Sequence, residues 1–305
     1  MAARALLLPL GAAGALLLPL AFGNPYALSV VILALLYAYL ALSWNLIGGI
    51  TGQLSLGHAA YFGIGAYTST VLFADLGLTP WLGMLAGAVL AGIAAVVIGL
   101  PCFRLRGAYY ALATLAAAVI LKVVVENSNE LLGGPRGLDV RLLHDAPLYF
   151  QHTSKLFYYY VVLLLVGGAL AANRWCLRSR FGYYLTAIRN DQEAAAALGV
   201  DARRYKLLAA VLSAAMTAIG GTFYAQYALF ISPEKVFGVH LSVQIAVICI
   251  IGGRGTLWGP LLGALLLLMV VMRFEPRGVI ALLGRALSGS RRLSGKAAKV
   301  RREAA

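Results

Sequence analysis

The polar residues that could do chemistry inside this hydrophobic chain gather in one short stretch. Gln53, Ser55 and His58 lie close together among the glycines that run from Gly48 to Gly65. Such polar groups can line a path for a polar solute, and a helix interrupted by glycine can turn its backbone dipoles toward that solute. Small residues also let neighbouring helices pack closely. A pathway lining and close helix packing are both open interpretations, and for His58 a structural hydrogen bond is the alternative to a role in transport.

Side chains for catalysis, nucleotide binding or metal binding do not occur in a recognisable arrangement. The best match to a phosphate-binding loop, Gly295-Lys296, continues into Ala297 and has Ser290 where the first glycine should stand. The chain has no nucleophile–base pair, and its three cysteines are far apart. We therefore expect no catalytic residue, no metal site and no cofactor in this chain, and any ATP chemistry would belong to another chain.

Residues 174–204 form a polar segment that contains a predicted short helix. Asn190 is the predicted N-cap, and Glu193 three residues later completes a capping box. An alanine-rich run follows, and Gly199 suits the left-handed position just after a helix. Asp201 is the predicted cap of the next helix.

The predicted short helix carries little apolar bulk, since its centre is formed by alanines such as Ala194 and Ala195. A helix that lies on a membrane surface usually presents Trp, Phe and Leu to the lipid. A small, well-capped helix suits a groove in a partner protein instead. An interfacial helix that merely connects two membrane spans is the alternative.

Composition predicts a polytopic membrane protein. Of the 305 residues 61% are hydrophobic and only 12% are charged, with a mean hydropathy of +0.85. This excludes an ordinary soluble enzyme and a secreted disulfide scaffold, and argues against nucleic-acid binding despite the net charge of +14. We predict an all-α bundle of about 8–9 spans. Candidate spans are residues 3–22, 26–48, 53–73, 81–101, 107–125, 155–173, 205–228, 238–252 and the shorter run 257–272.

The distribution of basic residues predicts a cytoplasmic N-terminus. With that orientation, the connections before residue 257 place ten Lys or Arg residues inside and four outside, where acidic residues offset them. The run 3–22 is interpreted as a retained helix, with a signal peptide as the alternative.

The C-terminal part breaks this charge pattern. The run 257–272 is too short for two crossings, and nine basic residues follow it. A full crossing would place them outside, whereas a re-entrant or interfacial segment would keep them inside. We predict a membrane domain at 1–275 and a basic tail at 276–305 that is cytoplasmic, disordered and attracted to anionic lipid.

Several motifs together resemble one family. Glu193-Ala194-Ala195 followed by Gly199 is similar to the EAA loop of ABC importer permeases, which forms the helix that docks on the ATPase subunit. The segments 46–67, 103–115, 252–260 and 276–278 resemble signatures of the branched-chain amino acid permeases, M-type subunit. The chain departs from that family where only 15 residues (261–275) separate Gly259-Pro260 from Pro276-Arg277-Gly278, so the family's last crossing is expected to be absent.

The local sequence features and the resemblance together give three sets of candidate site residues. The coupling set is Asn190, Glu193, Ala194, Ala195 and Gly199. The candidate pathway set is Gln53, Ser55, His58, Tyr61 and Thr114. The candidate docking set for a substrate-binding protein is Gly133, Gly134 and Arg136, for which a plain turn is the alternative.

The resemblance also implies a function and partners. The expected protein is a permease subunit that works by alternating access in a bacterial inner membrane, paired with a second permease, two ATPase subunits that bind ATP and magnesium, and a periplasmic binding protein. Leu, Ile and Val are the expected solutes, with urea or short amides as the alternative. A secondary transporter or a channel is a further alternative, but every Asp and Glu falls in a loop or at a span edge, where ion coupling is not expected.

Overall fold

The fold follows from long apolar runs that are separated by glycine, proline and polar residues. The computed structural model describes residues 25–140, 146 and 149–274. The run 3–22 and the tail 276–305 lie outside these residues, so the expectations for them stay predictions. The elements are α2 (Pro25–Trp44), the π-helix η1 (Asn45–Ile50), α3 (His58–Leu76), α4 (Pro80–Cys102), α5 (Ala108–Asn127), α6 (Asn129–Leu132), the 3-10 helix η2 (Gly134–Arg136), β1 (Leu138–Asp139), α7 (Lys155–Arg178), α8 (Arg180–Asn190), α9 (Gln192–Ala197), α10 (Ala202–Ala228), β2 (Phe230–Ile231), α11 (Pro233–Val236), α12 (Val239–Gly253) and α13 (Gly259–Phe274).

The all-α polytopic architecture is confirmed. Each predicted span from 26–48 onward corresponds to a helix. Among the residues that the structure describes, six segments are long and apolar enough to cross a membrane; α3 is not one of them, and the apolar helix at 259–269 is shorter. The predicted span 53–73 is shifted, because residues 51–57 are not helical and α3 begins only at His58. The predicted loop 174–204 is largely helical, since α7 runs to Arg178 and α8 follows it.

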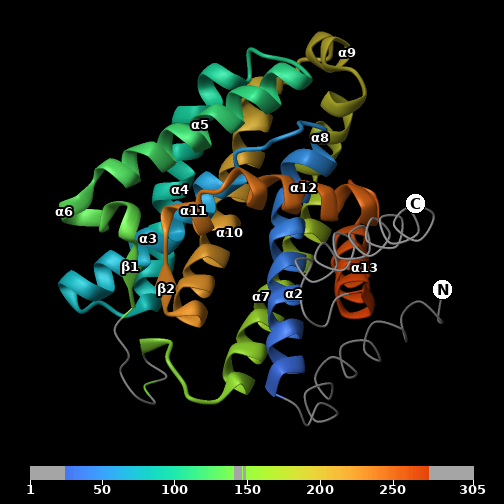
Figure 1. The fold of residues 1–305 in the computed structure, drawn as a ribbon. Helices are drawn as coiled ribbons and strands as arrows, with labels where there is room; N and C mark the ends of the chain where they lie inside the picture. The colour runs from blue at the N-terminus through green and yellow to red at the C-terminus, as the bar shows by residue number, and fades with distance from the viewer. Residues whose placement is uncertain (1–24, 141–145, 147–148, 275–305) are drawn as a thin grey trace, which may run out of the picture. The chain divides into compact units, whose positions relative to one another are not determined.

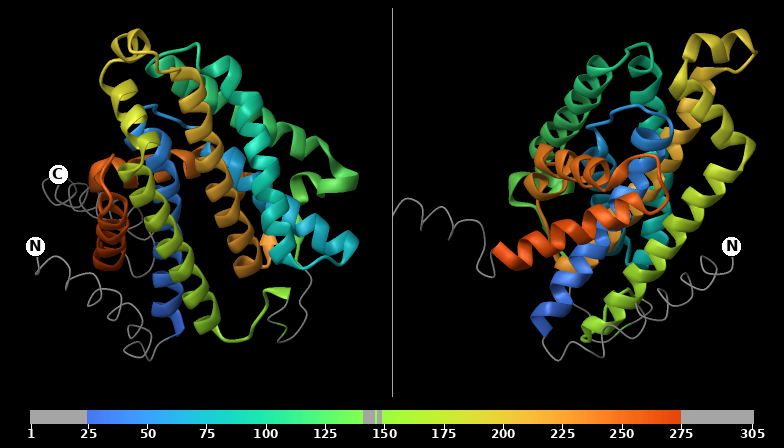
Figure 2. Two further views of the ribbon diagram at one scale, coloured as in Figure 1. Left: turned by 180° about the vertical axis from the view of Figure 1, so that it is seen from behind. Right: turned by 90° about the vertical axis from the view of Figure 1, so that its right-hand side faces the viewer.

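Helix packing in the centre depends on small residues. α3, α4 and α10 pack against one another, and α2 packs against both α7 and α10 (Figures 1 and 2). A Cβ on Gly65 would lie 2.0 Å from the Ala218 carbonyl oxygen, and one on Gly221 would lie 2.0 Å from the Phe62 carbonyl oxygen. These backbones approach so closely that only glycine fits, as in close helix pairs of membrane proteins.

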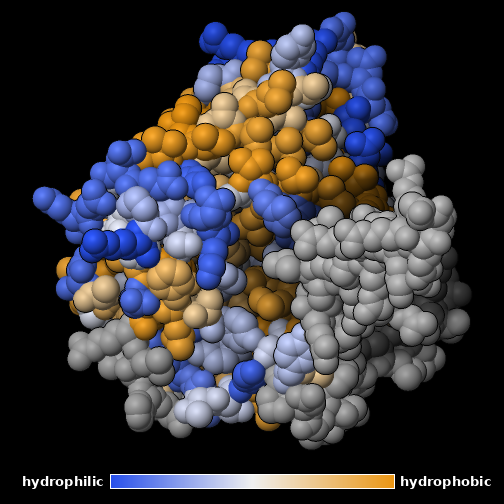
Figure 3. Space-filling model, in the orientation of Figure 1, coloured by the Kyte–Doolittle hydropathy of each residue, from blue (hydrophilic) through white to orange (hydrophobic). Residues whose placement is uncertain are grey.

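The α4 helix has two chemically different faces. One face is buried and carries Gly83, Gly87, Ala91 and Ala95. The other is exposed and carries Leu85, Val89, Ile93 and Val97. The α5 helix also exposes apolar side chains, and Figure 3 shows hydrophobic surface over α5, whereas hydrophilic residues gather at the end that carries α9. This pattern fits a helix that faces lipid on its outer side.

A two-stranded antiparallel sheet joins the connection after α6 to the end of α10. Leu138 pairs with Ile231, and Asp139 pairs with Phe230. The chain divides after Ala264 into two units, and the first unit contains α2 to α12.

Candidate functional site

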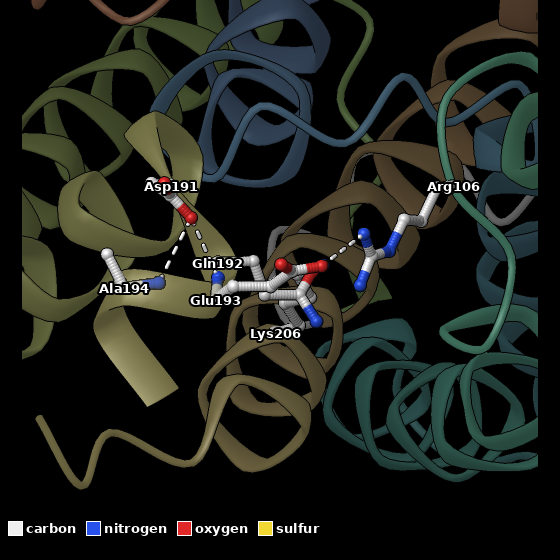
Figure 4. Close-up of polar contacts among 6 residues, drawn as sticks. All are labelled: Arg106, Asp191, Gln192, Glu193, Ala194 and Lys206. Atoms are coloured by element: carbon white, nitrogen blue, oxygen red, sulfur yellow. Dashed lines mark hydrogen bonds and ion pairs between the residues drawn. The ribbon is translucent and has the colours of Figure 1, made fainter. Parts of the chain in front are cut away.

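The segment from α8 to α10 contains the predicted short helix as α9. Its N-cap is Asp191, whose Oδ1 accepts hydrogen bonds from the backbone N–H groups of Glu193 (2.9 Å) and Ala194 (3.0 Å) (Figure 4). The prediction that Asn190 caps this helix was wrong. Asn190 is the last residue of α8, and Asp191 has the extended backbone that an N-cap requires. With the cap moved by one residue, Glu193 no longer has the spacing of a capping box.

Instead of capping, Glu193 contacts the connection between α4 and α5. Its Oε1 lies 3.1 Å from Nη1 of Arg106. The adjacent Gln192 accepts a 2.7 Å hydrogen bond from Nζ of Lys206, a residue of α10 that is only 3% exposed. Arg106, Gln192 and Lys206 were not singled out from sequence. A lysine in the first turns of a helix that enters a hydrophobic bundle was the signal that could have found Lys206.

The other end of α9 agrees with its prediction. Gly199 has φ +82°, the left-handed conformation that glycine adopts without strain, and nothing occupies the space where its Cβ would stand. Asp201 accepts a hydrogen bond from the N–H of Arg204 at 3.1 Å and so caps α10, as predicted.

One face of α9 packs on the protein and the other is open. Ala195 is buried against Ile188 and Ala202. Ala194, Ala197 and Leu198 are exposed, and Leu198 has 86% of its surface accessible. Their i, i+3, i+4 spacing places them on one side of the helix. The buried side of the helix thus packs on the protein, and the exposed side forms a small apolar face. Leu198 belongs to this face and was not among the predicted coupling residues.

Four of the five candidate pathway residues are buried, and Gln53 is half-buried. His58 lies between two hydroxyl groups, with its Nε2 2.9 Å from Ser213 Oγ and its Nδ1 3.2 Å from Ser55 Oγ. Ser213 donates to the carbonyl of Ser43 at 2.7 Å. Ser213 therefore accepts from Nε2–H, and in a neutral imidazole Nδ1 accepts from the Ser55 hydroxyl, so that both ring nitrogens have partners.

The neighbouring residues extend this arrangement. Thr114 of α5 accepts from the N–H of Leu56 at 3.1 Å, and the indole N–H of Trp44 donates to the Ser55 carbonyl at 2.7 Å. The ring of Tyr61 meets His58 edge-on at 5.8 Å. These bonds join α2, α3, α5 and α10 around the irregular segment 51–57, so packing explains its small and polar residues in this conformation. Its role in a pathway stays a prediction.

The candidate docking segment is a tight turn. Gly133 and Gly134 have φ of +67° and +53°, and Gly137 donates to the Gly134 carbonyl at 3.2 Å. Arg136 is exposed, whereas Gly134 is buried. Nearby, Lys122 of α5 forms ion pairs with Glu126, at 3.7 Å, and with Glu234 of α11. The turn presents Arg136 outward, and docking of a binding protein on this turn stays a prediction.

Among the residues that the structure describes, no group of His, Cys, Asp or Glu could hold a metal ion. The α9 helix packs against α8 and α10, and this packing sets the direction in which its exposed face points.

Comparison with known proteins agrees with this picture. The family model described as "Branched-chain amino acid transport system / permease component" matches residues 26–273. The high-affinity branched-chain amino acid transport system permease protein LivM of Escherichia coli (strain K12) is 32% identical over 83% of this chain and 66% of its own length. LivH of the same organism is 27% identical over 76% of this chain and 79% of LivH.

A more distant relative is the nucleoside ABC transporter permease protein NupC of Lactococcus lactis subsp. cremoris (strain MG1363), which is 26% identical over 65% of this chain and 68% of NupC. No solved structure matches the chain. The match spans about two thirds of the length of LivM. The chain belongs to the branched-chain amino acid transport permease family, in which it is more similar to the LivM type of subunit than to the LivH type.

Proposed function

We propose that this chain is one of two permease subunits of an ATP-driven importer that carries branched-chain amino acids. The observation that carries the proposal is the exposed face of α9, formed by Ala194, Ala197 and Leu198. A capped helix with small side chains can seat in a groove of an ATPase subunit, and Leu198 supplies an apolar anchor for it. The names of LivM and LivH support the solute and the pairing with a second permease.

The orientation that we propose places α9 in the cytoplasm and the N-terminus on the same side. It is supported by charge, since basic residues gather around α9 and the opposite end pairs its Lys122 with acids. The basic residues on the α9 side are Arg104, Arg106, Arg174, Arg178, Arg180, Arg189, Arg203, Arg204, Lys206 and Arg254. The membrane would be the bacterial inner membrane.

In this proposal the chain itself binds no cofactor. ATP and magnesium would be held by two ATPase subunits, and a periplasmic binding protein would dock on the turn that contains Gly133, Gly134 and Arg136. The chain would act in transport rather than as an enzyme, changing which side of the membrane its interior faces. Urea, short amides and, from the similarity to NupC, nucleosides are the alternative solutes.

Reconstitution tests the proposal. The chain is placed in proteoliposomes with a LivH-type permease, two ATPase subunits and a binding protein, and leucine uptake is followed with and without ATP. We expect ATP-dependent uptake that unlabelled isoleucine and valine inhibit and that urea and nucleosides do not. Uptake that needs an ion gradient instead of ATP would contradict the proposal.

The docking role of α9 has a matched pair of variants. Leu198→Asp places a charge in the proposed groove, so the ATPase should no longer co-purify and uptake should be lost. Leu76→Asp makes the same change at an exposed leucine at the end of α3 and should leave co-purification intact. Equal co-purification of both variants would contradict docking through α9.

A further inference from the structure

One side chain in the last turn of α8 reaches the π-helix that follows α2. Arg189 lies two residues before the cap of α9, and its Nη1 donates a 2.9 Å hydrogen bond to the backbone carbonyl of Gly49. Gly49 belongs to the π-helix Asn45–Ile50. Single π-helical turns are uncommon and often occur at functional sites.

Glycines make room for this side chain on two sides. A Cβ on Gly52 would lie 2.5 Å from Cγ of Arg189, and one on Gly255 would lie 2.6 Å from its Nη1. Both glycines have positive φ, +76° for Gly52 and +78° for Gly255. Gly255 belongs to the turn between α12 and α13. The guanidinium of Arg189 therefore contacts both the π-helix and this turn.

The same two backbone segments are joined by Asn45. Its Oδ1 accepts from the N–H of Gly255 at 2.7 Å, and its Nδ2 donates to the carbonyl of Thr256 at 3.0 Å and to Oδ1 of Asn173 at 3.1 Å. Asn45 is fully buried. The π-helix, the α12–α13 turn and α7 are therefore one hydrogen-bonded unit, and Arg189 connects that unit to the segment that carries α9.

We propose that Arg189 is the positioning residue that transmits movement of α9 to this unit. The inference rests on the proposed function, because it takes α9 as the ATPase docking helix. An arginine suits the task, since its guanidinium forms a charge-assisted hydrogen bond at the end of a long side chain. Movement of α9 displaces the end of α8, and the Arg189 hydrogen bond pulls the Gly49 carbonyl and the neighbouring α12–α13 turn with it.

The experiment measures solute transported per ATP hydrolysed by the whole complex in proteoliposomes. Arg189→Ala should lower this ratio about tenfold while ATP hydrolysis continues, because one charged hydrogen bond is lost without loss of the docking face. Arg189→Lys keeps a donor and should retain most of the ratio. Arg180→Ala, which removes an arginine from the first turn of the same helix, should behave as wild type.

Glycine variants test the contact of Arg189 with the α12–α13 turn. Gly255→Ala places a Cβ against Nη1 and should reproduce the loss of coupling. Gly77→Ala is the control for backbone strain alone, because Gly77 also has positive φ (+63°) but nothing lies within 4 Å of its Cβ position. Wild-type coupling in Arg189→Ala, or a proportional fall of uptake and hydrolysis together, would overturn the proposal.

A second readout does not depend on transport. In Thr256→Cys, labelling of the exposed thiol reports the α12–α13 turn, and the three native cysteines are buried. Adding the ATPase subunits and ATP should change the labelling rate, and Arg189→Ala should abolish that change. If the change persists in Arg189→Ala, the inference fails even where the importer works. If labelling responds but ATP drives no uptake, the proposed function fails and the contact stands.

Discussion

The two ends of the helix bundle treat their buried polar groups differently. Near α9, His58 forms hydrogen bonds with Ser55 and Ser213, and Ser213 donates to a backbone carbonyl in turn. Toward the end that carries β1 and β2, the hydroxyl groups of Tyr67 and Thr70 and both amide atoms of Gln226 are buried without a hydrogen-bond partner among the described residues. The first region is a closed network, and the second consists of polar groups without partners.

This difference has an energetic meaning. A buried polar atom without a partner costs about 1–3 kcal/mol, whereas a satisfied network fixes a single arrangement of its helices. Gln226 is four residues beyond Thr222, which donates to the carbonyl of Gly65 in the adjacent α3. The unpartnered groups therefore lie along the same α3–α10 contact as the satisfied ones. Hydrogen bonds among polar groups hold the α9 end in place. At the opposite end the buried polar groups lower the stability of the protein for as long as they lack partners.

The largest expected effect comes from breaking the satisfied network. His58→Leu removes both imidazole nitrogens and leaves the Ser55 hydroxyl without its acceptor, so stability should fall by about 2 kcal/mol. The measurement is thermal unfolding of the purified complex in detergent. His58→Gln, which keeps an amide donor and acceptor, should lose less. An unchanged midpoint in His58→Leu would mean that the network does not hold these helices.

At the end that carries β1 and β2, we expect removal of a buried polar side chain to increase stability. Gln226→Leu removes two unpartnered polar atoms at similar volume, so the protein should become more stable by about 1 kcal/mol. Thr222→Val is the matched control one turn earlier, and it should lower stability because its hydroxyl has a partner. The contrast between the two regions would not hold if Gln226→Leu destabilised the protein as much as Thr222→Val.

The next largest effect on stability is expected at Asp191, the N-cap of α9. Asp191→Ala leaves two N–H groups without an acceptor and should destabilise this short helix by about 1 kcal/mol. Because α9 is held less firmly, ATP-dependent uptake should fall while the amount of protein in the membrane stays constant. Asn190→Ala tests the corrected cap position and should have little effect. The reverse ranking of the two variants would restore Asn190 as the cap.

The sequence predicted the helices well because apolar runs and glycine breaks are local features. It also predicted the left-handed Gly199 and the Asp201 cap, which depend on a few adjacent residues. It missed α8 and shifted the cap to Asn190, since Asn and Asp are equivalent as caps and only the end of the preceding helix decides between them.

Contacts between distant segments were beyond the reach of sequence patterns. The bonds from Arg189 to Gly49 and from Lys206 to Gln192 depend on how α8, α10 and α2 pack. A basic residue in a cytoplasmic segment is expected from the positive-inside rule alone, so nothing in its type distinguishes Arg189 from its neighbours. Similarly, burial of Gln226 without a partner is a property of the α3–α10 contact.

The smallest effect on stability is expected for Glu193, which pairs with Arg106 but is exposed. The side chains are 80% and 70% accessible, and exposed ion pairs of this kind contribute little because water and salt screen them. Glu193→Gln should therefore change stability by less than about 0.5 kcal/mol, and a double-mutant cycle with Arg106→Gln should give an equally small coupling energy. Glu193→Lys should lower uptake without unfolding the protein, because it reverses the charge beside the docking face. A coupling energy as large as the loss in His58→Leu would show that a partner alone, without burial, stabilises this end of the molecule.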